Sequence, residues 1–365
     1  MRVGVVGGGQ LARMMIPAAE ALGVSIRVLA DAENSSAQLA ATAVGDYRDL
    51  DTLLGFATAV DVVTFDHEHV PTALLEELEN RSVLVRPGPH ALVYAQDKAA
   101  MRARLAETSV PLPEWRVATS EVEAEEFLGN HGQEAIAKTP RGGYDGRGVR
   151  VIRSASEVAD WFAVGEVLLE ERVSFSRELA QLVARSPSGE VRLFPLVETI
   201  QQDGVCAEVI APAPETTDSL SARTAEIART IAEELGVTGV LAVELFQVGD
   251  DVVVNELAMR PHNSGHVFTE GAVTSQFEQH LRAVLDWPLG GTSLTYPWSV
   301  MVNMFGDAGQ ERITAALGTS DRVRVHAYGK EPRPGRKAGH IVVSGDKLED
   351  VRDIARRAAQ AGERA

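Results

Sequence analysis

The chain has 365 residues, of which 45% are apolar and 24% are charged. This length suits roughly two to three domains, and the composition is that of a globular protein rather than a disordered chain. The net charge of −17 disfavours a general nucleic-acid binder but leaves room for a small anionic substrate in a local basic pocket. The single cysteine, Cys206, excludes an internal disulfide and a cysteine-based zinc site.

Membrane and targeting segments are not expected. The start, MRVGVVGGGQ, leads directly into a strand-like pattern, and no run of ~18 uncharged apolar residues occurs in the sequence. We therefore expect a cytoplasmic protein without a membrane span.

The first hundred residues alternate strands with helices. Expected strands cover residues 2–6, 25–30, 60–65 and 82–85, and expected helices cover residues 10–22 and 72–80. This alternation predicts a parallel α/β sheet.

A smaller α+β unit and an antiparallel unit follow. In the smaller unit we expect helices over 95–107 and 156–163, and strands over 135–138, 149–153 and 167–171. Beyond it we expect strands near 178–185, 191–197, 207–211, 239–248 and 251–258, and helices over 219–235, 275–285 and 348–360. The GDD turn between the last two strands indicates a hairpin.

The glycine turn after the first strand fits a dinucleotide fingerprint. Gly7, Gly9 and Ala12 match G-x-G-x-x-G/A, and Asp31 ends the next expected strand, where a ribose-binding acid would lie. A nicotinamide-dependent oxidoreductase is therefore one hypothesis. The same turn also suits another phosphate at a helix N-terminus, or only a tight turn.

The hairpin carries two carboxylates that we expect to face each other. With the turn centred on GDD, Glu244 lies opposite Glu256 and Phe246 lies opposite Val254. Facing carboxylates on apolar strands repel unless a cation lies between them, and Mg²⁺ takes such oxygens, with Asn255 beside them. The alternative is an arginine from elsewhere paired with one glutamate, and a bulge would change the register.

A glycine-rich loop follows Lys138, which is one of only five lysines in the chain. Residues 142–148 contain four glycines, whose backbone N–H groups can wrap a phosphate beside the lysine. The loop is not a Walker A motif, and a surface hairpin beside a chance lysine is the alternative.

Together these motifs resemble the ATP-grasp superfamily, and within it the 5-(carboxyamino)imidazole ribonucleotide synthetase family of purine biosynthesis. The resemblance rests on GGGQL (7–11), KTPRGGYDGRG (138–148), EERV (170–173), Asn255-Glu256, RPHNSGH (260–266) and GRKAGH (335–340). It implies an ATP-grasp fold of mixed α/β and α+β type. The implied domains are a Rossmann-like parallel-sheet domain (1–98), a small lid (99–176) and a larger antiparallel-sheet domain (177–365).

The resemblance also implies an ATP site with a metal. Its implied ATP contacts are Lys98, Lys138, the flap residues Gly143, Tyr144, Asp145, Gly146, Arg147, Gly148 and Val149, the hinge residues Glu170, Glu171, Arg172 and Val173, and Glu178, Asn255 and Glu256. Glu244 and Glu256 would hold Mg²⁺, or Mn²⁺ in its place, with Asn255 assisting.

For the ribonucleotide the implied contacts are Gly9, Gln10, Leu11, Glu68, Tyr144, Arg147, Arg260, His262, Asn263, Ser264, Lys330, Arg336 and Lys337. Arg260, His262 and Glu68 are the candidate catalytic residues, and His262 and Glu68 remain alternatives for a general base. His262 and His266 also have the spacing of a metal pair, although Ser264-Gly265 between them argues against one helix face. A loop of capping residues is the other interpretation of RPHNSGH.

Several positions depart from the family pattern. Ala12 stands where glycine is usual, Val149 where glutamine is, and Met259 where proline is common. In ETIQQDG, Thr199 and Gln201 replace a frequent asparagine and histidine, so no ligand contact is carried over there. FDHEHV (65–70) differs from the usual form but keeps Glu68.

The resemblance implies the reaction of ATP, bicarbonate and 5-aminoimidazole ribonucleotide through carboxyphosphate to the N-carboxylated ribonucleotide, ADP and phosphate. It also implies a homodimer. The competing hypotheses are another ATP-grasp ligase or carboxylase, the oxidoreductase named above, and a nucleotide-binding regulator without turnover.

Overall fold

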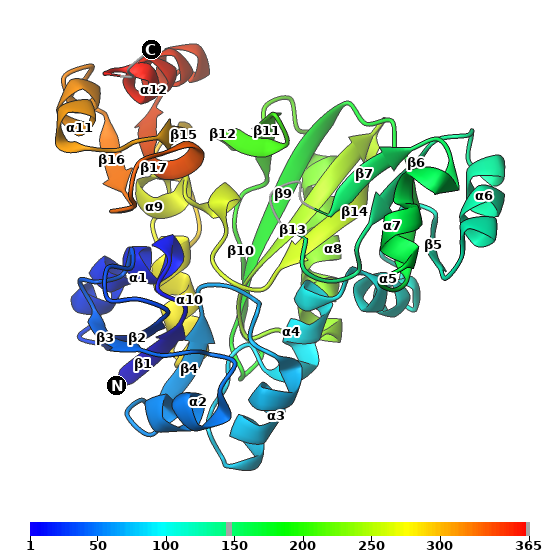
Figure 1. Ribbon diagram of the computed structural model, residues 1–365. Coiled ribbons are helices and arrows are strands. Elements are labelled where there is room, and N and C mark those ends of the chain that lie inside the picture. The colour runs from blue at the N-terminus through cyan, green and yellow to red at the C-terminus, as the bar shows by residue number, and fades with distance from the viewer. Residues whose placement is uncertain (144–147, 363–365) are drawn as a thin grey trace.

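The computed structural model describes residues 1–143 and 148–362, which form three sheets (Figure 1). The N-terminal sheet is parallel, in the order β3-β2-β1-β4. Its elements are β1 (Arg2–Val6), α1 (Gln10–Ala21), β2 (Ser25–Ala30), β3 (Ala41–Val44), α2 (Leu50–Ala57), β4 (Val62–Phe65) and α3 (Thr72–Asn80). Val3 and Val6 of β1 are both fully buried but belong to different apolar clusters, as expected of a parallel strand covered on both faces.

The lid carries the second sheet, in the order β5-β8-β6-β7, at the right of Figure 1. Helices α4 (Pro89–Gln96) and α5 (Lys98–Ala106) lead into it. The lid contains β5 (Trp115–Ala118), α6 (Glu121–Asn130), β6 (Ala135–Lys138), β7 (Val149–Ile152), η1 (Ala155–Val158), α7 (Ala159–Phe162) and β8 (Val167–Glu171).

The large sheet is antiparallel, in the order β14-β13-β9-β11-β12-β15-β17-β16, with β10 paired to β9. Its strands are β9 (Arg177–Arg185), β10 (Val191–Leu193), β11 (Val197–Gln202), β12 (Val205–Ala211), β13 (Gly239–Val248), β14 (Asp251–Ala258), β15 (Trp298–Gly306), β16 (Arg324–Ala327) and β17 (Arg333–Gly345). The helices of this part are α8 (Asp218–Glu234), η2 (Asn263–Gly265), α9 (Phe268–Gly271), α10 (Gln276–Val284), α11 (Gln310–Leu317) and α12 (Leu348–Gln360).

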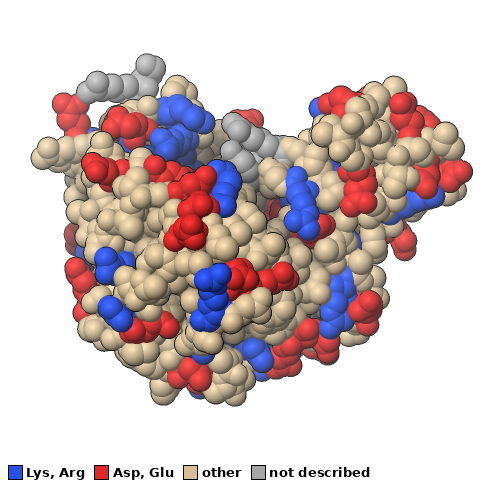
Figure 2. Space-filling model, turned by 60° about the horizontal axis from the view of Figure 1, so that its bottom comes forward, with Lys and Arg blue, Asp and Glu red and all other residues tan. Residues whose placement is uncertain are grey.

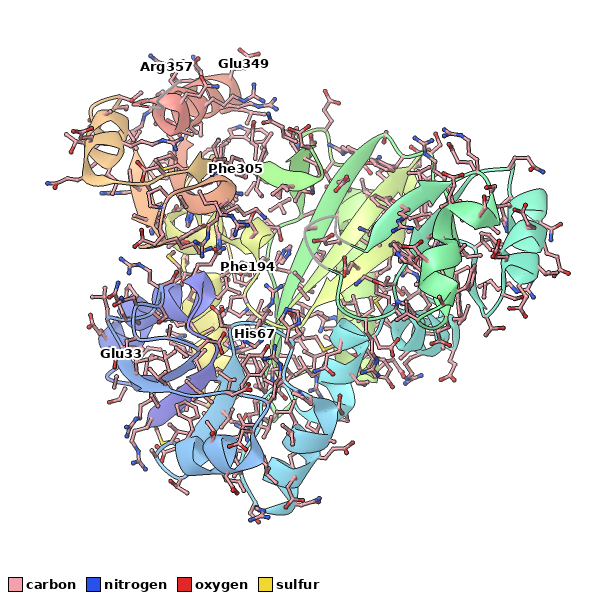
Figure 3. All side chains as sticks on the ribbon, viewed as in Figure 1. Glu33, His67, Phe194, Phe305, Glu349 and Arg357 are labelled. Atoms are coloured by element: carbon pink, nitrogen blue, oxygen red, sulfur yellow. The ribbon has the colours of Figure 1, made fainter. Side chains whose placement is uncertain are left out.

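The two faces of the large sheet pack against different partners. Leu241 and Val243 of β13 belong to a cluster that contains α8 and part of the N-terminal domain. Ala242 between them belongs to a second cluster with α9 and α10, in which Phe194, labelled in Figure 3, stacks on Phe268 with ring centroids 4.7 Å apart. Glu244 lies on this second face, since side chains alternate along a strand.

The surface and the helices give two further observations. On the face shown in Figure 2, Lys and Arg side chains are interspersed among Asp and Glu side chains. Within residues 1–143 and 148–362, no helix combines the length and the apolar character that crossing a membrane requires.

Several predicted elements are corrected by the structure. Residues 82–85 form no strand, because only Val85 pairs there, in a single bridge with Val63. The helix expected over 95–107 is interrupted at Asp97, whose side chain caps α5 by accepting from the Ala100 backbone N–H at 3.0 Å. The pairs β3 with α2 and β5 with α6 were not predicted.

Candidate functional site

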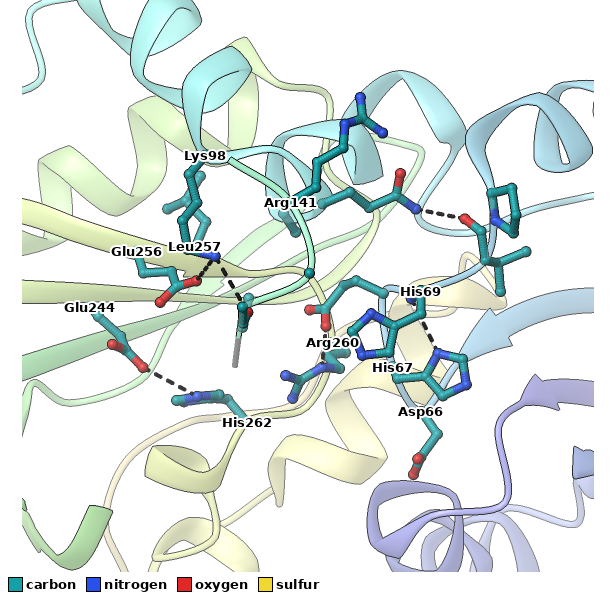
Figure 4. Close-up of a pocket in the computed structure, with 18 residues that line it drawn as sticks. Asp66, His67, His69, Lys98, Arg141, Glu244, Glu256, Leu257, Arg260 and His262 are labelled. Carbon is teal, nitrogen blue, oxygen red and sulfur yellow. Dashed lines mark hydrogen bonds and ion pairs between the residues drawn. The ribbon is translucent and has the colours of Figure 1, made fainter. Parts of the chain in front are cut away.

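Three cavities adjoin where the sheets meet. We call them the lid cavity, between the lid and the large sheet (about 410 Å³), the basic cavity, between α1 and β17 (about 620 Å³), and the central cavity between them (about 580 Å³; Figure 4). His262 lines all three. Asn263 and Lys337 line both the lid cavity and the basic cavity, so these two cavities share a wall.

The lid cavity brings together most residues predicted to bind ATP. They are Lys98, Lys138, Val149, Glu170, Glu171, Arg172, Val173, Glu178, Asn255 and Glu256, with Glu244 beside them. Sequence reasoning missed its apolar walls, which include Ile136 and the stacked rings of Phe175 and Phe246, 4.4 Å apart. A slot with aromatic and aliphatic walls suits a flat base.

A β-bulge sets the geometry of the predicted metal ligands. Glu244 pairs with Glu256 as predicted, but Leu245 pairs with Val254, so Asn255 is an extra residue in β14. The predicted pairing of Phe246 with Val254 is therefore wrong, because Phe246 pairs with Val253. In a regular strand Val254 and Glu256 would share a face. Here Val254 lies in the apolar core, whereas Asn255 and Glu256 both face the lid cavity.

Cations surround the bulge on the lid side. Lys98 Nζ lies 3.2 Å from Glu256 Oε1, and Lys138 Nζ donates to Asn255 Oδ1 at 3.2 Å (Figure 4 shows Lys98). Asn255 Nδ2 donates to Glu244 Oε2 at 3.4 Å. In this conformation the amide oxygen of Asn255 faces Lys138, so a metal-ligand role for this oxygen requires a rotation of the amide.

Glu244 is a carboxylate whose pKa is raised by its surroundings. Burial, together with the negative charges of Glu256 and Glu178, raises the pKa of Glu244 to about 8. Paired carboxylate oxygens in this state fit a hard divalent cation such as Mg²⁺. No cluster of three or more His, Cys, Asp or Glu side chains suited to a metal occurs in the described residues, so the remaining ligands would be water or phosphate oxygens.

Glu170, the first of the hinge residues, is the centre of a buried cluster of charged side chains. Its Oε1 accepts from Arg102 Nε at 2.7 Å and its Oε2 from Lys138 Nζ at 2.8 Å. Burial would raise the pKa of Glu170, but the charges of Arg102 and Lys138 hold it below its usual value. Arg102 was missed by sequence reasoning, because nothing in its local pattern shows that α5 faces the hinge.

Glu68 and Arg260 form a second ion pair. Arg260 Nε donates to Glu68 Oε2 at 2.6 Å, and the Met259 backbone N–H donates to Glu68 Oε1 at 3.1 Å. Burial would lower the pKa of Arg260, but Glu68 raises it above its usual value. Both oxygens of Glu68 are thus engaged in holding the Arg260 segment.

The N-terminus of α1 is occupied by the carboxylate of Asp66. Asp66 Oδ1 accepts from the Ala12 backbone N–H at 2.8 Å, and a Cβ on Gly9 would lie 2.0 Å from Asp66 Oδ2. Burial raises the pKa of Asp66, against the hydrogen bond from Ala12. A carboxyl group of the protein itself therefore fills the place where a dinucleotide pyrophosphate would bind, which disfavours the oxidoreductase hypothesis.

His262 and His266 diverge rather than form a metal pair. His262 Nε2 lies 3.3 Å from Glu244 Oε1, and its Nδ1 lies 2.8 Å from Ser264 Oγ. His266 instead meets Gln276 Nε2 at 2.9 Å and stacks on His340. Burial and the Arg260 charge lower the pKa of His262 to about 3, so the ring is neutral near pH 7.

The basic cavity collects most residues predicted to bind the ribonucleotide. They are Gly9, Gln10, Leu11, Arg260, His262, Asn263, Lys330, Arg336 and Lys337. Asp66 and Arg333 line it as well and were not predicted. Lys330 Nζ donates to Gln10 Oε1 at 2.5 Å, which joins the segment between β16 and β17 to α1. Of the other predicted contacts, Glu68 lines the central cavity and Ser264 is buried against His262.

The two described ends of the flap lie near this site. Lys98 Nζ donates to the Gly143 carbonyl at 3.4 Å, and the Thr139 backbone N–H donates to the Gly148 carbonyl at 2.9 Å. The predicted contacts Tyr144, Asp145, Gly146 and Arg147 lie outside the described residues.

One departure from the family pattern has a visible partner. Gln201 lines the lid cavity and donates from Nε2 to Glu178 Oε2 at 2.9 Å. Burial raises the pKa of Glu178, and this hydrogen bond opposes the rise. Gln201 therefore orients a carboxylate that was predicted to contact ATP.

Comparisons with known proteins agree over the whole chain. The family model described as ATP-grasp domain matches residues 103–277, the ribonucleotide synthetase preATP-grasp domain matches 1–96, and the phosphoribosylaminoimidazole carboxylase C-terminal domain matches 299–354. The chain is 49% identical over 370 residues to an N5-carboxyaminoimidazole ribonucleotide synthase of Mycobacterium tuberculosis, which covers 98% of this chain and 86% of that protein.

Solved structures give the same result. The crystal structure of N5-carboxyaminoimidazole ribonucleotide synthetase from Thermus thermophilus superposes with a TM-score of 0.91 at 36% identity, over 100% of this chain and 99% of that one. The Aspergillus clavatus synthase, in complex with ADP and 5-aminoimidazole ribonucleotide, superposes with a TM-score of 0.88 at 31% identity, over 98% and 97% of the two chains.

Proposed function

Since the chain belongs to the N5-carboxyaminoimidazole ribonucleotide synthase family of ATP-grasp enzymes, we infer that it carboxylates 5-aminoimidazole ribonucleotide with ATP and bicarbonate. The products are N5-carboxyaminoimidazole ribonucleotide, ADP and phosphate. The observation that carries the assignment to this chain's own residues is the shared wall of His262, Asn263 and Lys337 between the lid cavity and the basic cavity. A nucleotide in one cavity and a ribonucleotide in the other would meet there.

The chemistry needs activation of bicarbonate, which is a poor electrophile. A bicarbonate oxygen attacks the γ-phosphorus of ATP, the bond to ADP breaks, and carboxyphosphate forms. The amine of the ribonucleotide then forms a bond to the carboxyl carbon, phosphate leaves, and the amine loses a proton. For this sequence the protein supplies positioning, charge neutralisation and exclusion of water.

In the lid cavity we assign the adenine to the slot between the hinge residues and the paired phenylalanines, and the ribose hydroxyls to Glu178. Lys98 and Lys138 would hold phosphate oxygens beside the flap. Glu244 and Glu256 would hold Mg²⁺, whose charge, when bound, offsets that of the phosphates. The donor set supports this, because Glu244 and Glu256 face each other across the hairpin and the charge of Glu256 contributes to the raised pKa of Glu244.

In the basic cavity we assign the ribonucleotide phosphate to the cations near β17, Lys330, Arg336 and Lys337. Arg260 faces both the basic and the central cavities, where its planar guanidinium suits bicarbonate or carboxyphosphate. Glu68 positions Arg260 with both oxygens, whereas His262, with its pKa lowered to about 3, is a weak base near pH 7.

The finer organisation is also part of the proposal. We assign domain boundaries after residues 98 and 176, a cytoplasmic location and a homodimer, the last from the family alone. Light scattering on the purified chain tests the dimer.

The decisive test is phosphate release from ATP by the purified enzyme. Release that requires both 5-aminoimidazole ribonucleotide and bicarbonate supports the proposal, and so does a product that carries the bicarbonate carbon. Release that is independent of either compound contradicts it, and ATP binding without turnover would favour a regulator.

A further inference from the structure

Two cations of helix α5, one turn apart, contact the β-bulge of β14 that carries Asn255 and Glu256. Lys98 and Arg102 are four residues apart and so lie on one face of the helix. Lys98 Nζ reaches the Glu256 carboxylate at 3.2 Å, and Arg102 Nη2 donates to the Asn255 carbonyl at 2.7 Å. The two consecutive residues of the bulge are thus each held by one cation of α5.

Arg102 also holds Glu170, the carboxylate that pairs with Lys138. Its Nε donates to Glu170, whose other oxygen accepts from Lys138, and Lys138 donates to the Asn255 side chain at 3.2 Å. Arg102 therefore closes a loop of contacts through β8, β6 and β14, three strands that are distant in sequence. Its planar guanidinium makes two of these contacts at once, from Nε to Glu170 and from Nη2 to the Asn255 carbonyl.

Stability alone does not account for this arginine. Its side chain is 0% exposed, and Nη1 has no hydrogen-bond partner among the described residues. A buried guanidinium with an unmet donor costs free energy, and apolar replacement of buried ion pairs is often neutral or stabilising. Arg102 does not line any of the three cavities described above.

We propose that Arg102 is a positioning residue for the reaction: it fixes the bulge at Asn255 and, through Glu170, the ammonium of Lys138, so that the metal carboxylates and the phosphate lysine keep a common geometry. It acts on the nucleotide half of the site and leaves the ribonucleotide half unchanged. This inference rests on the proposed function, since it concerns the same ATP site.

The test compares R102K and R102M with R104M, because Arg104 lies on the same helix but pairs at the surface with Glu107 and Glu234. We expect R102M to raise the KM for ATP and the Mg²⁺ concentration at half-maximal rate at least tenfold. The KM for the ribonucleotide should change less than twofold. R102K should lie between R102M and wild type, and R104M should match wild type.

Calorimetric titration of each variant with ADP, with and without Mg²⁺, gives a readout that needs no turnover. We expect the gain in ADP affinity on adding Mg²⁺ to shrink at least fivefold in R102M. Unchanged ATP and Mg²⁺ dependence in folded R102M would overturn the inference. So would a loss confined to melting temperature and active fraction, which is what a purely structural role predicts.

If R102M does not fold, R102K decides by the same measurements, since it keeps the buried charge. The wild-type enzyme separates the two proposals. Wild-type phosphate release that does not depend on ribonucleotide and bicarbonate defeats the proposed function, whereas normal wild-type behaviour with an unaltered R102M and R102K defeats only the role of Arg102.

Discussion

The lid cavity and the basic cavity share a wall but differ in the charged side chains that would surround a bound phosphate. The lid cavity is lined by the carboxylates of Glu178, Glu244 and Glu256 as well as by Lys98 and Lys138, so that an added cation would offset the carboxylates when a triphosphate binds. The basic cavity is lined by Lys330 and Arg336 with their neighbours, and can hold a phosphate directly. The difference shows how a chain with a net charge of −17 accommodates anionic substrates. A bound cation would add positive charge in the lid cavity, whereas the side chains of the basic cavity supply it themselves.

The strongest test of the lid side is E256Q. We expect turnover to fall on the order of 10³-fold, because the site loses a carboxylate for the metal while core packing is untouched. Phosphate release at saturating Mg²⁺ measures the effect, and circular dichroism checks the fold. The exposed Glu233 on α8 provides the control variant E233Q. Near-wild-type activity of E256Q would remove Glu256 from the site.

Between the two cavities, R260K tests the planar guanidinium. The charge remains, but the two-point match to an oxyanion is lost, so kcat/KM for bicarbonate should fall about 10²-fold. R282K is the matched control, since Arg282 pairs with Glu278 on the surface of α10. If R260K affects only the KM for ATP, the assignment of Arg260 to bicarbonate is wrong.

On the basic side, R336M should raise the KM for the ribonucleotide about tenfold, the value of one charge-assisted contact. The KM for ATP should stay within twofold, because Arg336 lines the basic cavity and not the lid cavity. R357M, at an exposed arginine of α12, serves as control. Equal changes in both KM values would contradict the separation of the two sites.

The smallest effect concerns stability rather than either cavity. Burial lowers the pKa of His280 to about 3, and its ring meets Thr64 Oγ1 at 2.8 Å and the Val240 N–H at 3.1 Å. The folded state keeps this ring neutral while the unfolded state takes up a proton below about pH 6.5. Its contribution to stability is therefore complete above pH 6.5 and declines as the pH falls toward 3.

The variant H280Q should flatten this decline. One such group contributes a slope of at most about 1.4 kcal/mol per pH unit to the free energy of unfolding. Urea titrations at several pH values between 4 and 7 measure the slope, with H90Q, at an exposed histidine, as control. A slope in H280Q equal to that of wild type would show that other groups dominate acid unfolding.

Local pattern was sufficient where the chemistry is local. The strands 25–30, 135–138, 167–171, 239–248 and 251–258 end where they were predicted, and the hairpin fixes Glu244 opposite Glu256. The bulge at Asn255 was left open as an alternative rather than predicted, because the run of valines before it, 252–254, is apolar on both faces and hides the change in alternation.

Contacts over long sequence separations were the other failure. Asp66 on the N-terminus of α1 and Arg102 on Glu170 join segments that only the tertiary fold brings together. The short pairs β3 with α2 and β5 with α6 were missed as well, since β3 has no fully buried residue and carries little periodic signal. The glycine fingerprint itself misled, because Gly9 makes room for Asp66.

The bulge in β14 makes one hairpin unequally tolerant of changes in length. The turn at 249–251 lies at the exposed tip, and a residue added there would lengthen only the loop. Removing Asn255 would instead restore a regular ladder that keeps Glu256 opposite Glu244 but takes away the amide that contacts Lys138 and Glu244. The tip of this hairpin can therefore vary in length, whereas the extra residue of β14 is itself part of the site.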